Sequence, residues 1–123
     1  MFKDVEAFSG FSVDDIDAAK QFYGQTLGLD SSEQNGLLFL HLAGGRDTVV
    51  YPKADHTPAT FTILNFPVSD IEQTVEQLAA LGVSFERYEG LGQDERGIAR
   101  AGGPLIAWFK DPAGNILSVL QQD

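Results

Sequence analysis

The sequence contains no cysteine, and basic residues are scarce. Without thiols the chain has no disulfide framework, no thiolate metal site and no cysteine nucleophile, which is typical of a reducing compartment. Eight Lys and Arg residues stand against eighteen Asp and Glu, for a formal net charge of −10. This charge repels phosphate backbones and anionic lipid surfaces at long range. We therefore expect neither nucleic acid nor a membrane as a partner.

Targeting and membrane-spanning segments are not evident either. The opening residues, 1–6, lack a charged region followed by an apolar run, and no stretch approaches the roughly 18 apolar residues that cross a bilayer. We expect a soluble, cytoplasmic protein. The acidity has two interpretations: it attracts a cationic ligand, or it gives a solvated surface that maintains solubility. We favour the second, because net charge bears first on solubility.

Familiar catalytic motifs are also missing. The sequence has no G-x-S-x-G elbow, no Walker loop, no H-E-x-x-H and no G-x-G-x-x-G that opens a helix. Any catalytic or binding chemistry must therefore come from side chains that the fold brings together.

The sequence does contain enough apolar residues, 43% of 123, for one compact domain. Residues 5–52 have the periodicity and turn chemistry of a β-α-β-β-β module. Its expected elements are a strand at 7–13, a helix at 14–28, and strands at 29–32, 37–42 and 48–51.

A second module at 60–122 repeats the first after a polar linker at 53–59. Val13 and Ile16, at the start of the first helix, recur as Val68 and Ile71, which indicates an internal repeat. The elements expected in this half are a strand at 59–68, a helix at 69–82, a strand at 84–88, a Gly-rich connection at 89–103 with a candidate short strand at 98–101, and a hairpin at 103–123.

The closing hairpin turns at Asp111-Pro112-Ala113-Gly114-Asn115, where Pro presets a turn φ and Gly tolerates a positive one. With Phe109 before it, this turn resembles the F-x-D-P-x-G-N signature of the vicinal oxygen chelate superfamily, which includes glyoxalase I, extradiol dioxygenases, and fosfomycin and bleomycin resistance proteins. "FSVDDIDAAKQFYGQTLGL" and "VSDIEQTVEQLAALGV" are similar to other parts of the family pattern.

The resemblance implies an α+β fold over residues 1–123. Two tandem β-α-β-β-β modules, each with a curved four-stranded mixed sheet, would surround a concave cavity. The resemblance also implies a homodimer.

In metal-using relatives, His on the first strand of each module and a late Glu hold Fe, Mn, Ni, Co or Zn. Counted from the matching motifs, these positions fall on Phe8, Ile63 and Ser118, and none of them is a good ligand. The fourth position lies near Val49 to Tyr51, which offers no carboxylate. We therefore expect no metal and no other cofactor.

The inward positions implied by the resemblance predict a mostly apolar and aromatic cavity. Its candidate ligand-binding residues are Phe8, Phe39, His41, Tyr51, Ile63, Asn65, Trp108 and Ser118, with Gly10, Leu37 and Phe61 beside them. Such a lining suits a planar or hydrophobic small molecule that a few polar groups orient. Trp108 is equally compatible with core packing. For His41 an ordinary, partly buried strand position is favoured over a ligand contact.

Two functions from different classes fit these expectations. The first is a metal-independent binding protein, similar to the bleomycin-resistance branch, in which a homodimer sequesters an aromatic or cationic drug or metabolite. The second is a glyoxalase-like lyase, isomerase or dioxygenase with atypical or absent metal ligands. The missing ligands favour the first.

Overall fold

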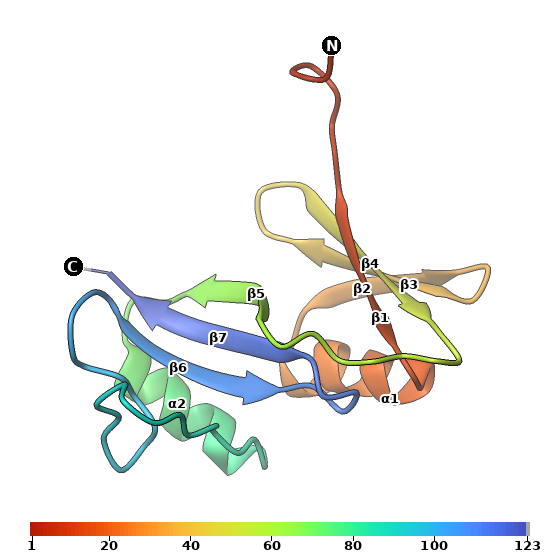
Figure 1. Cartoon of the computed structure of the whole chain (residues 1–123). Helices are drawn as coiled ribbons and strands as arrows, with labels where there is room; N and C mark the ends of the chain where they lie inside the picture. Colours follow the sequence, from red (N-terminus) through yellow and green to blue (C-terminus); the bar gives the residue numbers. More distant parts are fainter. Residues whose placement is uncertain (123) are drawn as a thin grey trace. The chain divides into compact units, whose positions relative to one another are not determined.

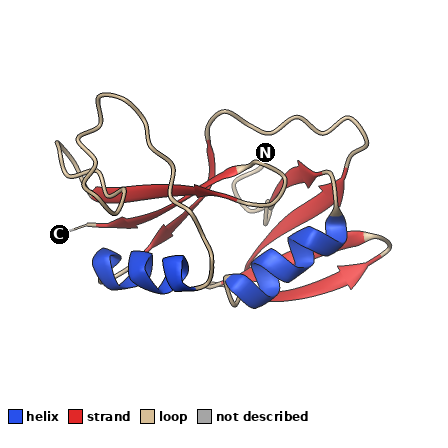
Figure 2. Cartoon of the chain, turned by 90° about the horizontal axis from the view of Figure 1, so that it is seen from below, coloured by secondary structure: helices blue, strands red, loops and turns tan. Residues whose placement is uncertain are grey.

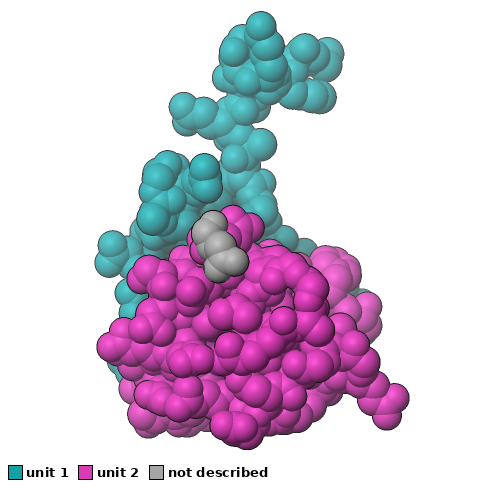
Figure 3. Space-filling view, turned by 90° about the vertical axis from the view of Figure 1, so that its left-hand side faces the viewer, with its two compact units in different colours: residues 1–57 teal, residues 58–123 magenta. Residues whose placement is uncertain are grey.

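The computed structural model describes residues 1–122, which form two compact units that divide between Thr57 and Pro58. Figure 3 shows the two units in different colours. Each contains one sheet with parallel and antiparallel pairs and one α-helix, so the predicted α+β class is confirmed. In both units the helix lies against its own sheet (Figure 2).

Unit 1 has a four-stranded sheet with the order β1-β4-β3-β2 (Figure 1). Strand β1 pairs parallel with β4, and the other pairs are antiparallel. Its elements are β1 (Ser9–Val13), α1 (Ile16–Gln21), the π-helix η1 (Phe22–Thr26), β2 (Asp30–Gln34), β3 (Leu37–Leu42) and β4 (Arg46–Pro52).

The first helix begins where the sequence predicts but changes its winding. The Asp15 carboxylate accepts N–H bonds from the first turn, as expected of an N-cap residue. From Phe22 onward the helix widens into a π-turn, in which Leu27 N–H donates to Phe22 O at 2.9 Å. The π-turn carries the fully buried Tyr23, whose ring packs against Phe11 and Phe22.

The alternation of side chains gives the sheet of unit 1 two different faces. Leu38, Leu40 and Val50 are completely buried and share the face that packs against α1. Phe39 and His41 alternate with them and point to the opposite side, which we call open face 1. By register, open face 1 carries Ser32, Leu37, Phe39, His41, Asp47, Val49 and Tyr51.

Unit 2 has a three-stranded sheet with the order β5-β7-β6. Its helix, α2 (Ile71–Ala80), is capped by Asp70 and buries one apolar side against β6 and β7. Its strands are β5 (Thr62–Pro67), β6 (Leu105–Lys110) and β7 (Ile116–Gln121). No helix among residues 1–122 is long and apolar enough to cross a membrane.

Two expected strands of unit 2 do not form. The predicted strand at 84–88 makes one isolated bridge, between Phe85 and Phe109, and the candidate strand at 98–101 makes only bridges at Ala99. The sheet therefore has three strands where the family resemblance implied four. The side chain of Gln93 bonds Tyr88 N–H, Glu86 O and Gly97 O, so part of this backbone bonds a side chain in place of a neighbouring strand.

Candidate functional site

Three of the predicted binding residues meet on the sheet of unit 2, on the face away from α2, which we call open face 2. Asn65 of β5 and Trp108 of β6 both pair with Ser118 of the central strand β7. Ser118 is fully buried, and its hydroxyl donates to Asn65 Oδ1 at 2.6 Å. Because Asn65 accepts this bond through oxygen, its exposed amide still has N–H donors for a ligand.

A second aromatic ring lies beside Trp108. The ring of Tyr88 meets it edge-on, with a centroid separation of 5.5 Å. Partial burial and the Glu86 carboxylate raise the pKa of Tyr88, against a smaller opposing effect of Lys110. The Tyr88 hydroxyl therefore stays protonated near neutral pH and can donate a hydrogen bond.

On open face 1 the structure brings His41 into a hydrogen-bonded chain. His41 Nε2 lies 2.9 Å from Ser32 Oγ, and His41 Nδ1 lies 2.9 Å from Asp47 Oδ1. The three side chains come from β3, β2 and β4, which are adjacent in the sheet. Phe39 is half-buried beside them, and Tyr51 is 39% exposed near the end of β4.

Three of the expected cavity residues are placed differently. Phe8 precedes β1 and is 69% exposed, and Phe61 precedes β5 and is 68% exposed. A bulge at Ile63 changes the register between Thr62 and Leu64, so the expected simple alternation from Phe61 to Asn65 does not hold.

Phe8, Ile63 and Ser118 are the residues that the family resemblance placed at metal-ligand positions, and the one polar side chain among these three, that of Ser118, is bonded to Asn65. Across residues 1–122, no group of three or more His, Asp or Glu side chains could hold a metal ion.

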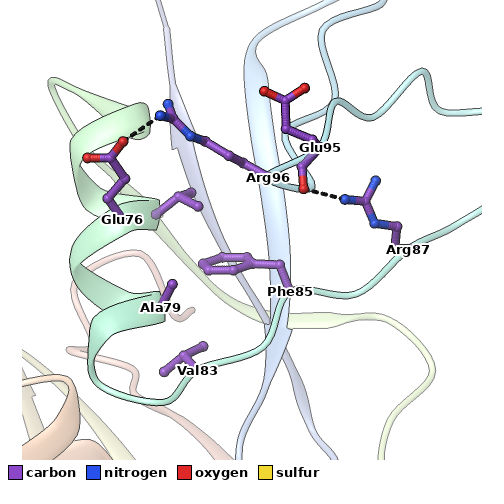
Figure 4. Close-up of a pocket in the computed structure, with 8 residues that line it drawn as sticks. Glu76, Ala79, Val83, Phe85, Arg87, Glu95 and Arg96 are labelled. Atoms are coloured by element: carbon purple, nitrogen blue, oxygen red, sulfur yellow. Dashed lines mark hydrogen bonds and ion pairs between the residues drawn. The ribbon is translucent and has the colours of Figure 1, made fainter.

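Unit 2 also has a pocket of about 330 Å³ beside α2 that the sequence did not predict (Figure 4). Its floor is apolar, and its rim carries two arginines and two glutamates, paired as Arg96 with Glu76 and Arg87 with the main-chain oxygen of Glu95. The floor residues are Val75, Ala79, Val83 and Phe85. Because both arginines already have partners, a ligand would have to compete with these bonds.

Ser32 and Asp47 were not predicted as site residues. The signal that could have found them is the turn Asn35-Gly36, whose two residues adopt positive φ and fix the pairing of β2 with β3. Once that register is fixed, Ser32 and His41 share a face of neighbouring strands. Asp47 needs the further pairing of His41 with β4 across a Gly-rich turn, which local sequence does not specify.

Comparison with known proteins gives one family and one fold. The family model described as Glyoxalase/Bleomycin resistance protein/Dioxygenase superfamily matches residues 8–119. No curated protein matches the sequence.

Among solved structures, the chain is similar to TnmS3, an antibiotic binding protein from Streptomyces sp. CB03234, with 22% identity, a TM-score of 0.72 and 98% of each chain covered. It is similar to a glyoxalase family protein from Enterococcus faecalis at 22% identity and a TM-score of 0.71, covering 98% of this chain and 99% of that one. The fosfomycin resistance protein FosX from Mesorhizobium loti shares 13% identity with a TM-score of 0.68, over 100% of this chain and 95% of that one. At these identities the likeness shows the fold alone.

Proposed function

The chain belongs to the Glyoxalase/Bleomycin resistance protein/Dioxygenase superfamily, and we propose that it is a binding protein that holds an aromatic or cationic small molecule without a metal. The observation that carries this proposal is the arrangement of Trp108, Asn65 and Ser118 on open face 2. An antibiotic binding protein among the structures of similar fold supports it.

Open face 2 offers an aromatic ring on which a ligand can stack and a polar side chain that can orient the ligand. Trp108 is half-buried and braced by the edge of Tyr88, so its ring is held in place for a planar ligand. The Asn65 amide can orient a ligand acceptor, because its oxygen is already bonded to Ser118. A ligand cation gains further attraction from the indole face and from the net charge of −10.

Open face 1 is a second aromatic surface that a ligand could use. Phe39 and Tyr51 supply apolar area, and His41 supplies a polar group on the same face. In this proposal each face binds through aromatic contact, with one or two polar side chains setting orientation.

We also propose that the protein acts as a homodimer. Phe8 and Phe61 are large apolar side chains that remain more than two-thirds exposed, and a second copy would cover such groups. Light scattering on the eluting protein should give the mass of two chains, and a monomeric mass at micromolar concentration would contradict the dimer.

The binding proposal is tested by a thermal-shift screen of aromatic and cationic compounds, because a ligand that binds only the native state raises the melting temperature. For a compound that stabilises the protein, Trp108→Ala should weaken the affinity measured by calorimetry by about 2- to 13-fold, the equivalent of about 0.5–1.5 kcal/mol of aromatic contact. Phe2→Ala removes another aromatic ring, 75% exposed and outside both sheets, and should leave the affinity unchanged.

Two results would overturn the proposal. One is the absence of stabilisation by any compound in the panel. The other is binding that disappears after chelation with EDTA and returns with a divalent metal, because the proposed contacts use only side chains of the protein.

A further inference from the structure

The hydrogen bonds around His41 fix the direction in which a proton can move. An ionised carboxylate only accepts hydrogen bonds, so the 2.9 Å contact with Asp47 Oδ1 requires the proton of a neutral His41 ring to be on Nδ1. His41 Nε2 then carries a lone pair, and the 2.9 Å contact with Ser32 Oγ is a bond in which the serine hydroxyl donates. The imidazole is thus set to remove the proton of Ser32.

From this arrangement we propose that Ser32, His41 and Asp47 hydrolyse small activated esters on open face 1. Ser32 is the nucleophile and His41 is the general base, while Asp47 holds the ring in the required tautomer and stabilises the imidazolium. We assign these roles from the hydrogen bonds between the three side chains and not from their order in the sequence, because unrelated folds build the same chemistry from different strands and loops.

The reaction balances without a metal or a redox partner. Ser32 Oγ attacks the acyl carbon as its proton passes to His41 Nε2. The bond from the acyl carbon to the alcohol oxygen breaks, and His41 returns the proton to the departing alcohol. Water then attacks the acyl-serine with His41 again as base, releasing the acid and restoring the Ser32 hydroxyl.

The surroundings indicate the class of ester. Phe39 lies directly opposite Ser32 in the β2–β3 pair, and Val49 lies opposite Phe39, so a short apolar acyl group has a surface beside the nucleophile. The side chains of Ser32, His41 and Asp47 are all exposed, which admits small substrates without any opening motion. The net charge of −10 favours neutral or cationic esters over anionic ones.

The edge of the sheet offers donors for the acyl oxygen. Strand β2 is the edge strand, so alternate backbone N–H groups along it point away from β3 and can donate to the oxyanion that develops during attack. Asp30 lies opposite His41 in the same strand pair, so this face carries a second carboxylate.

The chain provides a matched control, because it contains only two histidines. His56 also contacts a serine of unit 1, Ser12, but through Nδ1, at 2.7 Å. His41→Gln and His56→Gln therefore each remove one ring that is bonded to a serine. Only the first removes the ring whose Nε2 faces a serine and whose Nδ1 faces a carboxylate.

The test measures hydrolysis of p-nitrophenyl acetate by the full chain. Ser32→Ala and His41→Gln should each lower the rate above background by about 100-fold or more, the lower end of what a positioned base contributes. His56→Gln should keep the wild-type rate. A fluorophosphonate probe should label the wild type at Ser32, located by peptide mass spectrometry, and should not label Ser32→Ala. Circular dichroism establishes that each variant is folded.

Asp47 is a positioning residue and needs a different measurement. Nitrogen-15 NMR of the His41 ring should show the proton on Nδ1 in the wild type, and Asp47→Asn should shift the tautomer toward Nε2 while lowering the ester hydrolysis rate. Equal rates in the wild type and Ser32→Ala, labelling at another residue, or an Nε2-protonated His41 in the wild type would each overturn the proposal. Ser32→Ala should keep any ligand affinity that depends on Trp108. A failure of the ester-hydrolysis proposal can therefore be distinguished from a failure of the ligand-binding proposal.

Discussion

In unit 1 the strand after the helix is complete, whereas in unit 2 the equivalent segment makes a single bridge. Strand β2 pairs with β3 through all five of its residues, while residues 84–88 pair with β6 only at Phe85. Both segments were predicted as strands. In unit 2 the side chain of Gln93 takes bonds of Tyr88 and Glu86, and Ile106 of β6 bonds Ala99, so these backbone groups are not available for a longer ladder.

The hairpin between β3 and β4 in unit 1 and the hairpin between β6 and β7 in unit 2 also differ, in the interactions that hold their turns. Between β3 and β4 the chain turns through exposed residues, with Gly44 and Gly45 at positive φ. Between β6 and β7 the turn is organised by the buried Asp111, whose carboxylate accepts from Ala113 N–H, Asn115 N–H and the Asn115 amide. Both turns thus have glycine at positive φ, and the turn of unit 2 adds hydrogen bonds to a buried carboxylate.

The largest effect should come from Asp111→Ala. The change removes the common acceptor of three hydrogen bonds of 2.9–3.0 Å in a buried turn, so we expect a loss of about 1–3 kcal/mol in the free energy of unfolding. Urea denaturation measures it. Asp55→Ala, which removes an exposed carboxylate that pairs with Lys53, should leave the urea midpoint nearly unchanged. Equal losses in the two variants would show that the Asp111 bonds do not stabilise the hairpin.

A pair of glycine variants compares the two turns directly. Gly45 and Gly114 have φ values of +73° and +86°, so alanine at either should cost about 1–2 kcal/mol of backbone strain. A Cβ at Gly45 meets nothing within 4 Å, whereas one at Gly114 lies 3.2 and 3.3 Å from ring carbons of Pro58. Gly114→Ala should therefore lose more stability than Gly45→Ala in the same urea experiment. If the two losses are equal, the turn of unit 2 is no more constrained by packing than that of unit 1.

Much of the fold could be predicted because its signals are local. The capping aspartates Asp15 and Asp70 and the turn Asn35-Gly36 act within a few residues, and they placed both helices and the start of β3 correctly. The bulge at Ile63 depends on the pairing with β7, which is distant in sequence, and the loss of the strand at 84–88 depends on bonds made by the Gln93 side chain and by Ala99, none of which periodicity reports. For the candidate site, alternation identified His41, whereas Ser32 and Asp47 required the register of three strands.

The connection at 89–103 gives the last contrast between the units, because ion pairs tie it to α2. Arg100 bonds both Asp94 and Glu72, and Arg96 bonds Glu76. Partial burial pushes the pKa of Asp94 upward, but hydrogen bonds from Arg100 and from the N–H groups of Ile98 and Arg96 outweigh it and hold this pKa below the usual aspartate value. In unit 1, Lys20 and Glu33 form an exposed pair between α1 and β2.

The smallest predicted effect is a pH response confined to this connection. A depressed pKa stabilises the fold above the unfolded aspartate value, near pH 3.9, and the contribution is lost as the pH falls through the lower, folded value. The Ile98 amide donates to Asp94 Oδ1 at 3.0 Å, so its hydrogen-exchange protection should fall in that acid range before that of Leu40 in β3. The change should stay within about 1 kcal/mol, because these pairs are partly exposed. Arg100→Gln removes a bond that lowers the pKa of Asp94, so the loss of protection at Ile98 should begin at a higher pH. If Ile98 and Leu40 lose protection together in both proteins, the Asp94 bonds do not hold the connection independently of the rest of the fold.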